Sequence, residues 1–372
     1  MVKDGKDPLQ SYHKNRIANR AKTVLAWRNR SKKPFFYGAL NVSIRSKILF
    51  VECDMIHLKE TLHKGGKNVS VLMENFSFRA LWTPELIVLL SIVAIIYFKI
   101  IGNWSRFKGG APVPLKQRIQ FILALVALYF GWGSPFYVAG HLMITFHMIQ
   151  MVFAYFIATP LFLLGIPRWL FEAVIERFRT PTTEKIFRVI WNPIAALLCF
   201  NLLFSIYHVP VVFDTLMQSV VWHSLYQNVL FVASVLMWWH MIAPIPSMFP
   251  LSDLRRIGYI FANGILITPA CALIIFAPVP LYLTYTDVSV WANVMAYCLP
   301  KGSPIPEGLL VGPESFAFLG KRTDQQLAGI LMKVMQELAY GTTIGFVFRQ
   351  WVAKEKQQDG ELTISDIPPA KL

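Results

Sequence analysis

Histidine and methionine side chains gather in the apolar parts of this sequence in a pattern that suggests metal chemistry. Five of the eight histidines lie in or at the ends of long apolar segments. Polar groups are costly in hydrocarbon, so a histidine inside a membrane segment is a candidate functional residue. Imidazole binds copper, zinc and iron, whereas thioether sulfur favours cuprous ion. Because methionines are the main neighbours of four of these histidines, the pattern favours a soft metal over a proton path.

The composition indicates that a membrane surrounds these side chains. The chain has 372 residues, of which 55% are hydrophobic and only 15% charged. This is too apolar for a soluble protein of this length. A bilayer requires apolar stretches of about 20 residues, and in lipid a helix satisfies its own backbone. We predict spanning helices over residues 84–101, 119–138, 141–165, 190–209, 220–243, 257–282 and 327–348.

The charges of the connecting loops predict an orientation. Basic residues are enriched in cytoplasmic loops, and one side of the predicted bundle carries 15 Lys and Arg against three on the other. The expected fold is therefore an all-α integral membrane bundle of seven helices, with its N-terminus outside and its C-terminal tail, 351–372, in the cytoplasm. The long outer loop 283–326 is expected to cap the outer helix ends. Pro193, Pro269 and Pro278 lie inside apolar runs and are expected to kink their helices.

The first 72 residues do not fit this topology. Residues 1–72 hold 15 basic and five acidic side chains, and no apolar run in them is able to cross a membrane. Two interpretations stay open: a basic amphipathic leader on a membrane surface, or a reading frame that starts at Met73. The seven-helix domain would then cover 73–350. Most of the positive charge belongs to this leader. The net charge of the chain therefore does not indicate a nucleic-acid-binding protein.

The predicted topology brings four histidines to the outer face and places His240 at the opposite one. The first of the four lies at the mouth of the third helix, and His147 lies about 1.7 turns deeper. Met151 follows four residues later and therefore shares its face. The end of the fourth helix and the start of the fifth supply two more imidazoles. The predicted metal ligands are His141, His147, Met151, His208 and His223.

Other residues near this face have supporting or simpler interpretations. Asp214 and Asp324 are candidates to hold imidazole tautomers, as carboxylates behind metal-bound histidines do. Lys333 and Glu337 are one turn apart and are expected to pair within their helix, facing the bundle. A histidine at a helix end, such as His240, is also a common interfacial anchor. A methionine in a membrane helix is often only packing.

Short motifs spread over residues 73–350 resemble those of a known family, the membrane-integral cytochrome c oxidase assembly factors of the Gram-positive CtaG type. The most specific motif runs from Asp324 to Gly329 and is followed by Met332. The other matching segments are Phe78-Arg79-Ala80-Leu81-Trp82, His147-Met148-Ile149-Gln150, Ala158-Thr159-Pro160-Leu161, Leu164-Gly165, Asn192-Pro193, Tyr207-His208-Val209-Pro210 and Met237-Trp238-Trp239.

This resemblance implies a multi-pass protein of the bacterial plasma membrane that is not an enzyme. It would mature a haem–copper oxidase by helping copper to reach the subunit that holds the copper–haem centre, with an extracytoplasmic copper donor upstream. Many family members have a second histidine where this chain has Met151. Thioether in that position favours cuprous ion over cupric ion or zinc.

Two other functions stay open at this point. His147 paired across helices with His208 or His223 would also suit a membrane cytochrome with bis-histidine haem. The other alternative is a structural scaffold for oxidase assembly that binds no metal.

Overall fold

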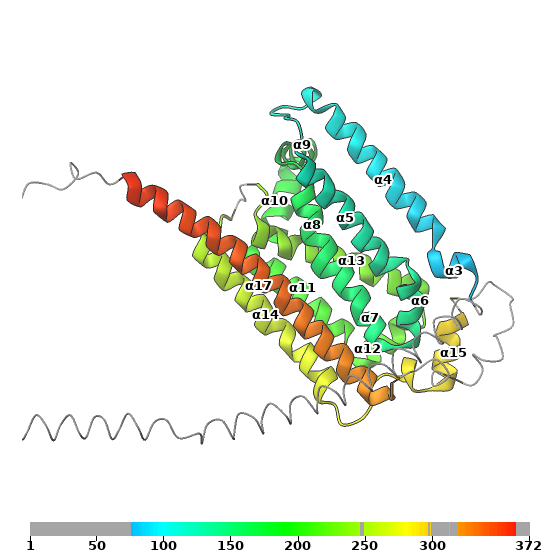
Figure 1. Ribbon diagram of the computed structural model, residues 1–372. Coiled ribbons are helices and arrows are strands. Elements are labelled where there is room, and N and C mark those ends of the chain that lie inside the picture. The colour runs from blue at the N-terminus through cyan, green and yellow to red at the C-terminus, as the bar shows by residue number, and fades with distance from the viewer. Residues whose placement is uncertain (1–75, 246–248, 297, 299–311, 313–318, 362–372) are drawn as a thin grey trace, which may run out of the picture. The chain divides into compact units, whose positions relative to one another are not determined.

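Every regular element in the part of the chain that the structure describes is a helix, which confirms the predicted all-α fold. This computed structural model describes residues 76–245, 249–296, 298, 312 and 319–361 (Figure 1). All of them belong to one compact unit, 68–372. Both interpretations of the leader 1–72 concern residues outside those described, and so does the second half, 362–372, of the predicted tail 351–372.

The helices follow one another, up to α15, with short connections, at most 10 residues long. In chain order they are α3 (Phe78–Trp82), α4 (Pro84–Gly102), η1 (Trp104–Arg106), α5 (Leu115–Trp132), α6 (Pro135–Leu142), α7 (Ile144–Met151), the π-helical η2 (Val152–Ala158), α8 (Thr159–Gly165), α9 (Arg168–Phe178), α10 (Pro181–Ile190), α11 (Pro193–Tyr207), α12 (Pro210–Met217), α13 (Val220–Ile242), α14 (Asp253–Phe276), η3 (Leu283–Tyr285), α15 (Val288–Ala296) and α17 (Lys321–Glu361).

The membrane character of the chain is confirmed by its helix lengths and composition. Five helical stretches of the described residues are long and apolar enough to cross a bilayer, and α10 with α11, bent by 64°, makes a sixth candidate. Helix α17 covers the predicted seventh span, 327–348, but is not among these candidates. The count of seven spans and the orientation of the bundle therefore stay predictions.

Prolines determine several helix boundaries: the predicted kink at Pro278 is wrong, whereas the chain does bend before Pro193, by 64° between α10 and α11. Pro193 begins α11 behind the capping side chain of Asn192, because a proline in the first turn loses no helical hydrogen bond. Pro278 lies beyond the end of α14, so the predicted span 257–282 is too long. Ala277, the residue directly before Pro278, no longer has helical backbone angles, with a ψ of 129°. Pro269 does lie inside α14, as predicted.

A π-helical segment interrupts the third predicted span directly after Met151. Pro160 lacks an N–H and its ring clashes with the carbonyl four residues earlier, which disturbs the helix ladder. Side chains of α13 satisfy a carbonyl that this irregularity leaves available. Trp238 Nε1 donates to the Tyr155 carbonyl at 2.8 Å, and Ser234 Oγ donates to it at 3.0 Å. Such π segments are frequent at functional sites.

Close backbone approaches hold the helices around the core. Helices α14 and α17 run side by side (Figure 1), and a Cβ at Gly329 would lie 2.7 Å from Ile275. Helix α8 packs as closely on α5, since a Cβ at Gly165 would lie 2.6 Å from backbone atoms of Phe121. Tyr97 donates a 2.8 Å hydrogen bond to the Gly165 carbonyl and joins α4 to the same contact.

We expect Gly165→Ala to destabilise the protein, because the added methyl would clash with backbone atoms, which cannot move aside as a flexible side chain can. Overpacking of this kind costs about 1–3 kcal/mol. The matched control is Gly258→Ala in α14, where nothing lies within 4 Å of the added Cβ. Thermal unfolding of both variants in detergent measures the difference. Equal midpoints for the two variants would contradict the close approach of α8 and α5.

Candidate functional site

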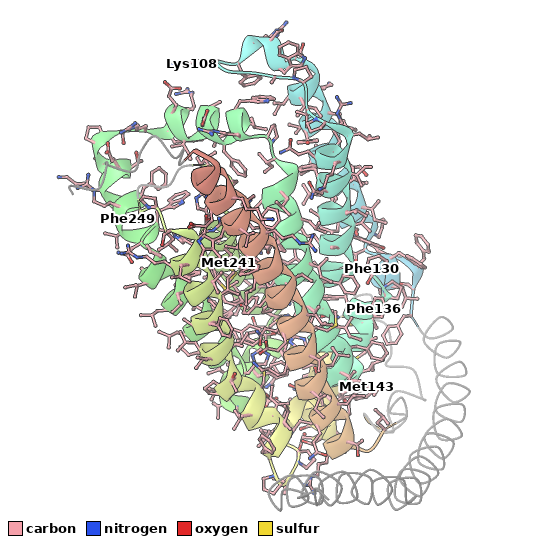
Figure 2. The ribbon with its side chains drawn as sticks, turned by 60° about the vertical axis from the view of Figure 1, so that its left-hand side comes forward. Lys108, Phe130, Phe136, Met143, Met241 and Phe249 are labelled. Carbon is pink, nitrogen blue, oxygen red and sulfur yellow. The ribbon has the colours of Figure 1, made fainter. Side chains whose placement is uncertain are left out.

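His240 is predicted to lie at the opposite end of the bundle from the other four histidines. Two methionines that neighbour His141 and His240 in sequence show this separation. Met143 follows His141 by two residues and lies near one end of the bundle, whereas Met241, next to His240, lies toward the other (Figure 2). All five of these histidines are buried rather than exposed at a helix end. The simple interfacial-anchor interpretation therefore does not describe His141 or His240.

The predicted place of His141 at the mouth of the third helix is wrong. It lies instead in α6, a short separate helix that ends at Leu142, before α7 begins at Ile144. The break at Gly133 and Ser134 starts α6, with Ser134 as its N-cap. Helix α6 folds against α7, and Gln150 of α7 donates to the Phe136 carbonyl of α6. His141 thus reaches the cluster from a different element than expected.

Three of the predicted ligands form a group of rings around Tyr207. The ring centre of His223 lies 6.1 Å from that of His141 and 6.5 Å from that of His147. Tyr207 stacks on His147 at 5.7 Å and on His223 at 6.2 Å. His208 follows Tyr207 directly, and its ring centre lies 5.2 Å from that of Tyr207. The structure therefore brings four histidines, from α6, α7, the C-cap of α11 and α13, to one region.

Two imidazole nitrogens in this group are buried without a partner. The Nε2 atoms of His147 and His208 have no hydrogen-bond partner among the described residues. The other ring nitrogen of His208, Nδ1, lies 2.7 Å from the Phe204 carbonyl. Because a carbonyl only accepts, Nδ1 carries the proton and Nε2 presents a lone pair. His141 Nδ1 is held in the same way by the Tyr137 carbonyl at 2.7 Å.

His223 is engaged in hydrogen bonds instead. Its Nε2 lies 2.8 Å from the Tyr207 hydroxyl and 3.1 Å from the Gln227 side-chain nitrogen. Both groups can donate, so this nitrogen is an acceptor whose lone pair is already in use. Sequence reasoning missed Tyr207 and Gln227. The signal for Gln227 was its spacing of four residues from His223, which places both on one helix face.

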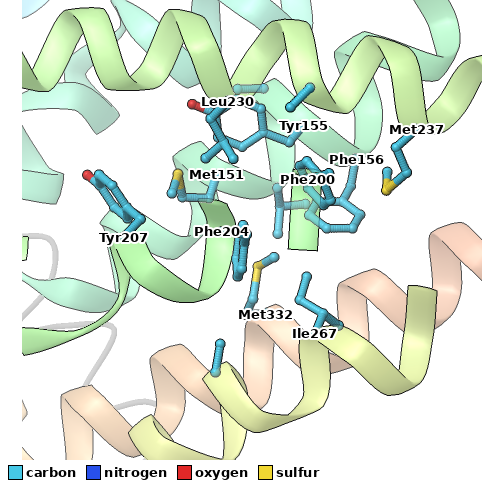
Figure 3. Packing of buried hydrophobic residues seen from close by; sticks show 14 of the residues in the cluster. Met151, Tyr155, Phe156, Phe200, Phe204, Tyr207, Leu230, Met237, Ile267 and Met332 are labelled. Atoms are coloured by element: carbon cyan, nitrogen blue, oxygen red, sulfur yellow. The ribbon is translucent and has the colours of Figure 1, made fainter. Parts of the chain in front are cut away.

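Met151 lies in the apolar core next to this group. It ends α7 one turn after His147, is 1% exposed, and packs in the cluster that contains Tyr207, Phe204 and Met332 (Figure 3). Within the part of the chain that the structure describes, no three His, Cys, Asp or Glu side chains gather closely enough to hold a metal ion together. In the arrangement described, at most two such side chains lie close enough to share one ion.

The two predicted aspartates hold backbone. Asp324 accepts from the amides of Ile144 and Thr145 at 2.9 and 3.3 Å, and so caps the first turn of α7. Asp214 accepts from the amides of Leu283 and Thr284 at 3.0 and 2.9 Å. These carboxylates position the elements around the histidines, while backbone carbonyls hold the imidazole tautomers.

The first part of the loop 283–326 folds over the histidine group. Tyr282 donates to the His208 carbonyl at 2.9 Å, and Tyr285 donates to the Gly140 carbonyl at 2.7 Å. Trp291 of α15 is fully buried among apolar side chains of α3 and α6. Asp287 directly precedes α15, and hydrogen bonds from the Ser289 side chain and from the amides of Val290 and Ser289 lower the pKa of its carboxyl. The loop residues 299–311 and 313–318 lie outside those described.

These features define an all-helical membrane protein with a buried histidine group near one end of its bundle. Compared with known families, residues 95–354 match the model of the cytochrome c oxidase caa3 assembly factor, Caa3_CtaG. The chain belongs to this family, which confirms the resemblance noted in the sequence. No curated protein matches the chain, and no solved structure does.

We expect Asp324→Ala to destabilise the protein and to loosen α7, because two buried amides would lose their acceptor. Loss of such a cap costs about 0.5–2 kcal/mol. Thr323→Ala, an exposed change in the same turn of α17, is the control. Hydrogen exchange at the amides of Ile144 and Thr145, followed by mass spectrometry, should increase in Asp324→Ala alone. Unchanged exchange in that variant would show that the cap does not hold α7.

Proposed function

We propose that this assembly factor binds cuprous ion at the histidine group and delivers it to the oxidase subunit that carries the copper–haem centre. Family membership makes the chain an oxidase assembly factor. The metal, its delivery and the place of the site on the outer face of the plasma membrane are our inference. In this proposal the ion is cargo received from an extracytoplasmic donor.

The observation that carries the proposal is the pair of buried imidazole nitrogens without a partner. A buried polar atom that makes no hydrogen bond costs about 1–3 kcal/mol. His147 Nε2 and His208 Nε2 both bear this cost, as far as the described residues show. Binding an ion at these lone pairs would remove the cost, and the carbonyl behind His208 already holds the tautomer that a metal needs.

The kind of ligand supports a cuprous ion in particular. Met151 lies on the same helix face as His147, in the apolar core, and a thioether prefers copper in its reduced state. The third nitrogen of the group, His223 Nε2, is held by Tyr207 and Gln227. It would have to leave those bonds to join the ligand set. An incomplete set of this kind suits a protein that has to release its cargo.

Aromatic packing favours an ion over the alternative of a bis-histidine haem. Rings of Tyr207 and Phe213 lie 5.7 and 5.1 Å from His147, and Phe204 lies 4.4 Å from His208. A porphyrin between these histidines would have to displace the rings, whereas one ion would not. A Soret band with sharp reduced α-bands in the purified protein would instead establish the haem alternative.

We expect copper binding under reducing, oxygen-free conditions to depend on His147 and His208. His147→Gln and His208→Gln should each weaken copper affinity by at least about 10-fold. Changing a residue that only hydrogen-bonds to a metal ligand already costs about that much, so loss of a ligand itself should cost no less. Met151→Leu should weaken it as well. Met148→Leu is the matched control, because Met148 is equally buried and lies on another face of the same helix. Competition with a chromogenic cuprous chelator measures all four.

Oxidase copper content in cells tests delivery separately from binding. The double variant His147→Gln with Met151→Leu should leave the oxidase deficient in copper while the Met148→Leu strain assembles it normally. If the double variant supports a fully metallated oxidase, the proposed cargo site is wrong. If the purified wild-type protein holds no copper under reducing conditions, and oxidase assembly still requires the protein, the metal-free scaffold is the better description.

A further inference from the structure

A carboxylate stands exposed on the side of the long helix α17. The predicted pair of Lys333 and Glu337 is present, with Lys333 Nζ 2.5 Å from Glu337 Oε1. The expectation that both residues face the bundle is wrong for the acid, since the Glu337 side chain is 58% exposed and that of Lys333 only 27%. The proposed copper function uses neither residue.

The neighbouring helix α14 shows the depth of this carboxylate. Helix α14 is one of the five described stretches that are long and apolar enough to cross a bilayer. Helix α17 lies along most of its length, because it packs on Ile275 near one end and accepts through Gln350 from Arg256, at 3.2 Å, near the other. Between these contacts, Lys333 Nζ donates at 3.2 Å to the carbonyl of Gly264, at the centre of α14. The ammonium and the carboxylate that it holds therefore lie at mid-span.

An exposed carboxylate at this depth faces lipid, which offers it no hydrogen bond. Ionisable side chains are rare within membrane helices and almost always face the bundle interior or a water-filled cavity. The described residues give Glu337 one partner, Lys333, at its Oε1 atom. The other oxygen, Oε2, is left for a group that the described residues do not supply.

The lysine of the pair needs no further partner. Besides the carboxylate and the Gly264 carbonyl, its ammonium contacts the Thr268 hydroxyl at 3.1 Å and the Gln336 side-chain oxygen at 3.0 Å. An ammonium has three hydrogens to donate, so these four acceptors satisfy it. Its positive charge also balances that of the carboxylate. What the pair lacks is therefore a hydrogen-bond donor without a charge of its own.

The surface beside this carboxylate admits another helix at close range. Gly341 and Gly345 follow Glu337 at four-residue spacing and so share its side of the helix. Nothing lies within 4 Å of a Cβ added to either glycine, and small residues let membrane helices approach closely. Next to them, an apolar groove of about 480 Å³ lies between α17 and the η2–α8 segment, with Leu338 and Thr342 in its lining. The groove offers room for larger side chains of a docked helix.

The missing donor identifies the kind of molecule that covers this face. Lipid acyl chains carry no hydrogen-bond donor. Two copies of this chain related by a twofold axis along the membrane normal would bring equivalent residues together at equal depth. Two carboxylates would then meet, and each would offer the other an acceptor and no donor. A helix of a different membrane protein, with a hydroxyl or amide side chain at mid-span, satisfies the carboxylate.

We propose that this face of α17, formed by Glu337, Leu338, Gly341, Thr342 and Gly345, docks a transmembrane helix of the oxidase that the protein helps to assemble. The docked helix donates a hydrogen bond from a hydroxyl or amide side chain to Glu337 Oε2. Its backbone lies close to the two glycines. This inference rests on the assembly role of the family and is independent of the proposed copper cargo.

The test is photo-crosslinking in membranes of cells that assemble the oxidase. A benzoylphenylalanine in place of Leu338, which is 57% exposed, should form an adduct with a transmembrane segment of an oxidase subunit. Mass spectrometry of the crosslinked peptides identifies that segment. The matched control is the same group in place of Leu89, a leucine of α4 that is 56% exposed. It should give no adduct with the oxidase.

Two further variants, combined with the photoreactive group at Leu338, test the chemistry of the contact. Glu337→Leu should lower the yield of the oxidase adduct by about 3–10-fold, the effect of one hydrogen bond between membrane helices. Gly341→Leu should lower it at least as much, because the side chain would fill the space for the partner's backbone. Its control is Gly258→Leu in α14, where an added Cβ also meets nothing within 4 Å.

The proposed copper site is tested apart from this surface. Glu337→Leu and Gly341→Leu should bind cuprous ion as tightly as the wild-type protein. The oxidase adduct should form equally well when His147→Gln is present, so failure of the copper proposal would leave the crosslinking result unchanged.

Three results would overturn the docking surface. They are adducts from the Leu338 position with lipid alone or with nothing, adducts only between two copies of this chain, and equal yields of oxidase adduct from the Leu338 and Leu89 positions. An equal effect of Gly341→Leu and Gly258→Leu would also contradict a close helix contact at Gly341. If Glu337→Leu does not accumulate in the membrane, this glycine pair still decides.

Discussion

The hydrogen bonds from the first amides of α7 to the Asp324 carboxylate tie the histidine helix to the rest of the bundle. Asp324 stands 180 positions away from Ile144, in the first turn of α17. The carboxylate and both amides are buried, where water does not replace a lost partner, so this carboxylate determines where α7 begins. The start of α7 in turn sets the depth of His147 and Met151, which lie within its two turns. Helix α17 therefore positions His147 and Met151 through Asp324, although none of the four grouped histidines belongs to α17.

The same constraint explains the irregular part of the third span. The π-helical η2 follows α7 directly, and its Tyr155 carbonyl is shared by Ser234 and Trp238 of α13. Helix α13 also contributes His223 and Gln227 at its beginning and His240 at its end. One helix thus contacts both the histidine group and the other end of the bundle. Its polar side chains satisfy irregular backbone in the middle of the span.

Five of the ten buried polar side-chain atoms without a partner, in the part of the chain described, belong to the histidine group and to the residues around His240. In the histidine group they are imidazole nitrogens in an aromatic, apolar setting, which suits a soft cation.

Local patterns along the chain were enough to predict the all-α membrane fold, the family, four histidines that lie in one region and the separation of His240 from them. Apolar length, helical spacing and short motifs are local, so each of these can be seen along the chain. Only the tertiary structure decided that α6 is a separate helix bringing His141 to the cluster, that Asp214 and Asp324 hold backbone, and that Tyr207 stands between His147 and His223. Such facts depend on which groups meet across distant segments, and a hydrogen bond missing in space leaves no mark on the order of residues.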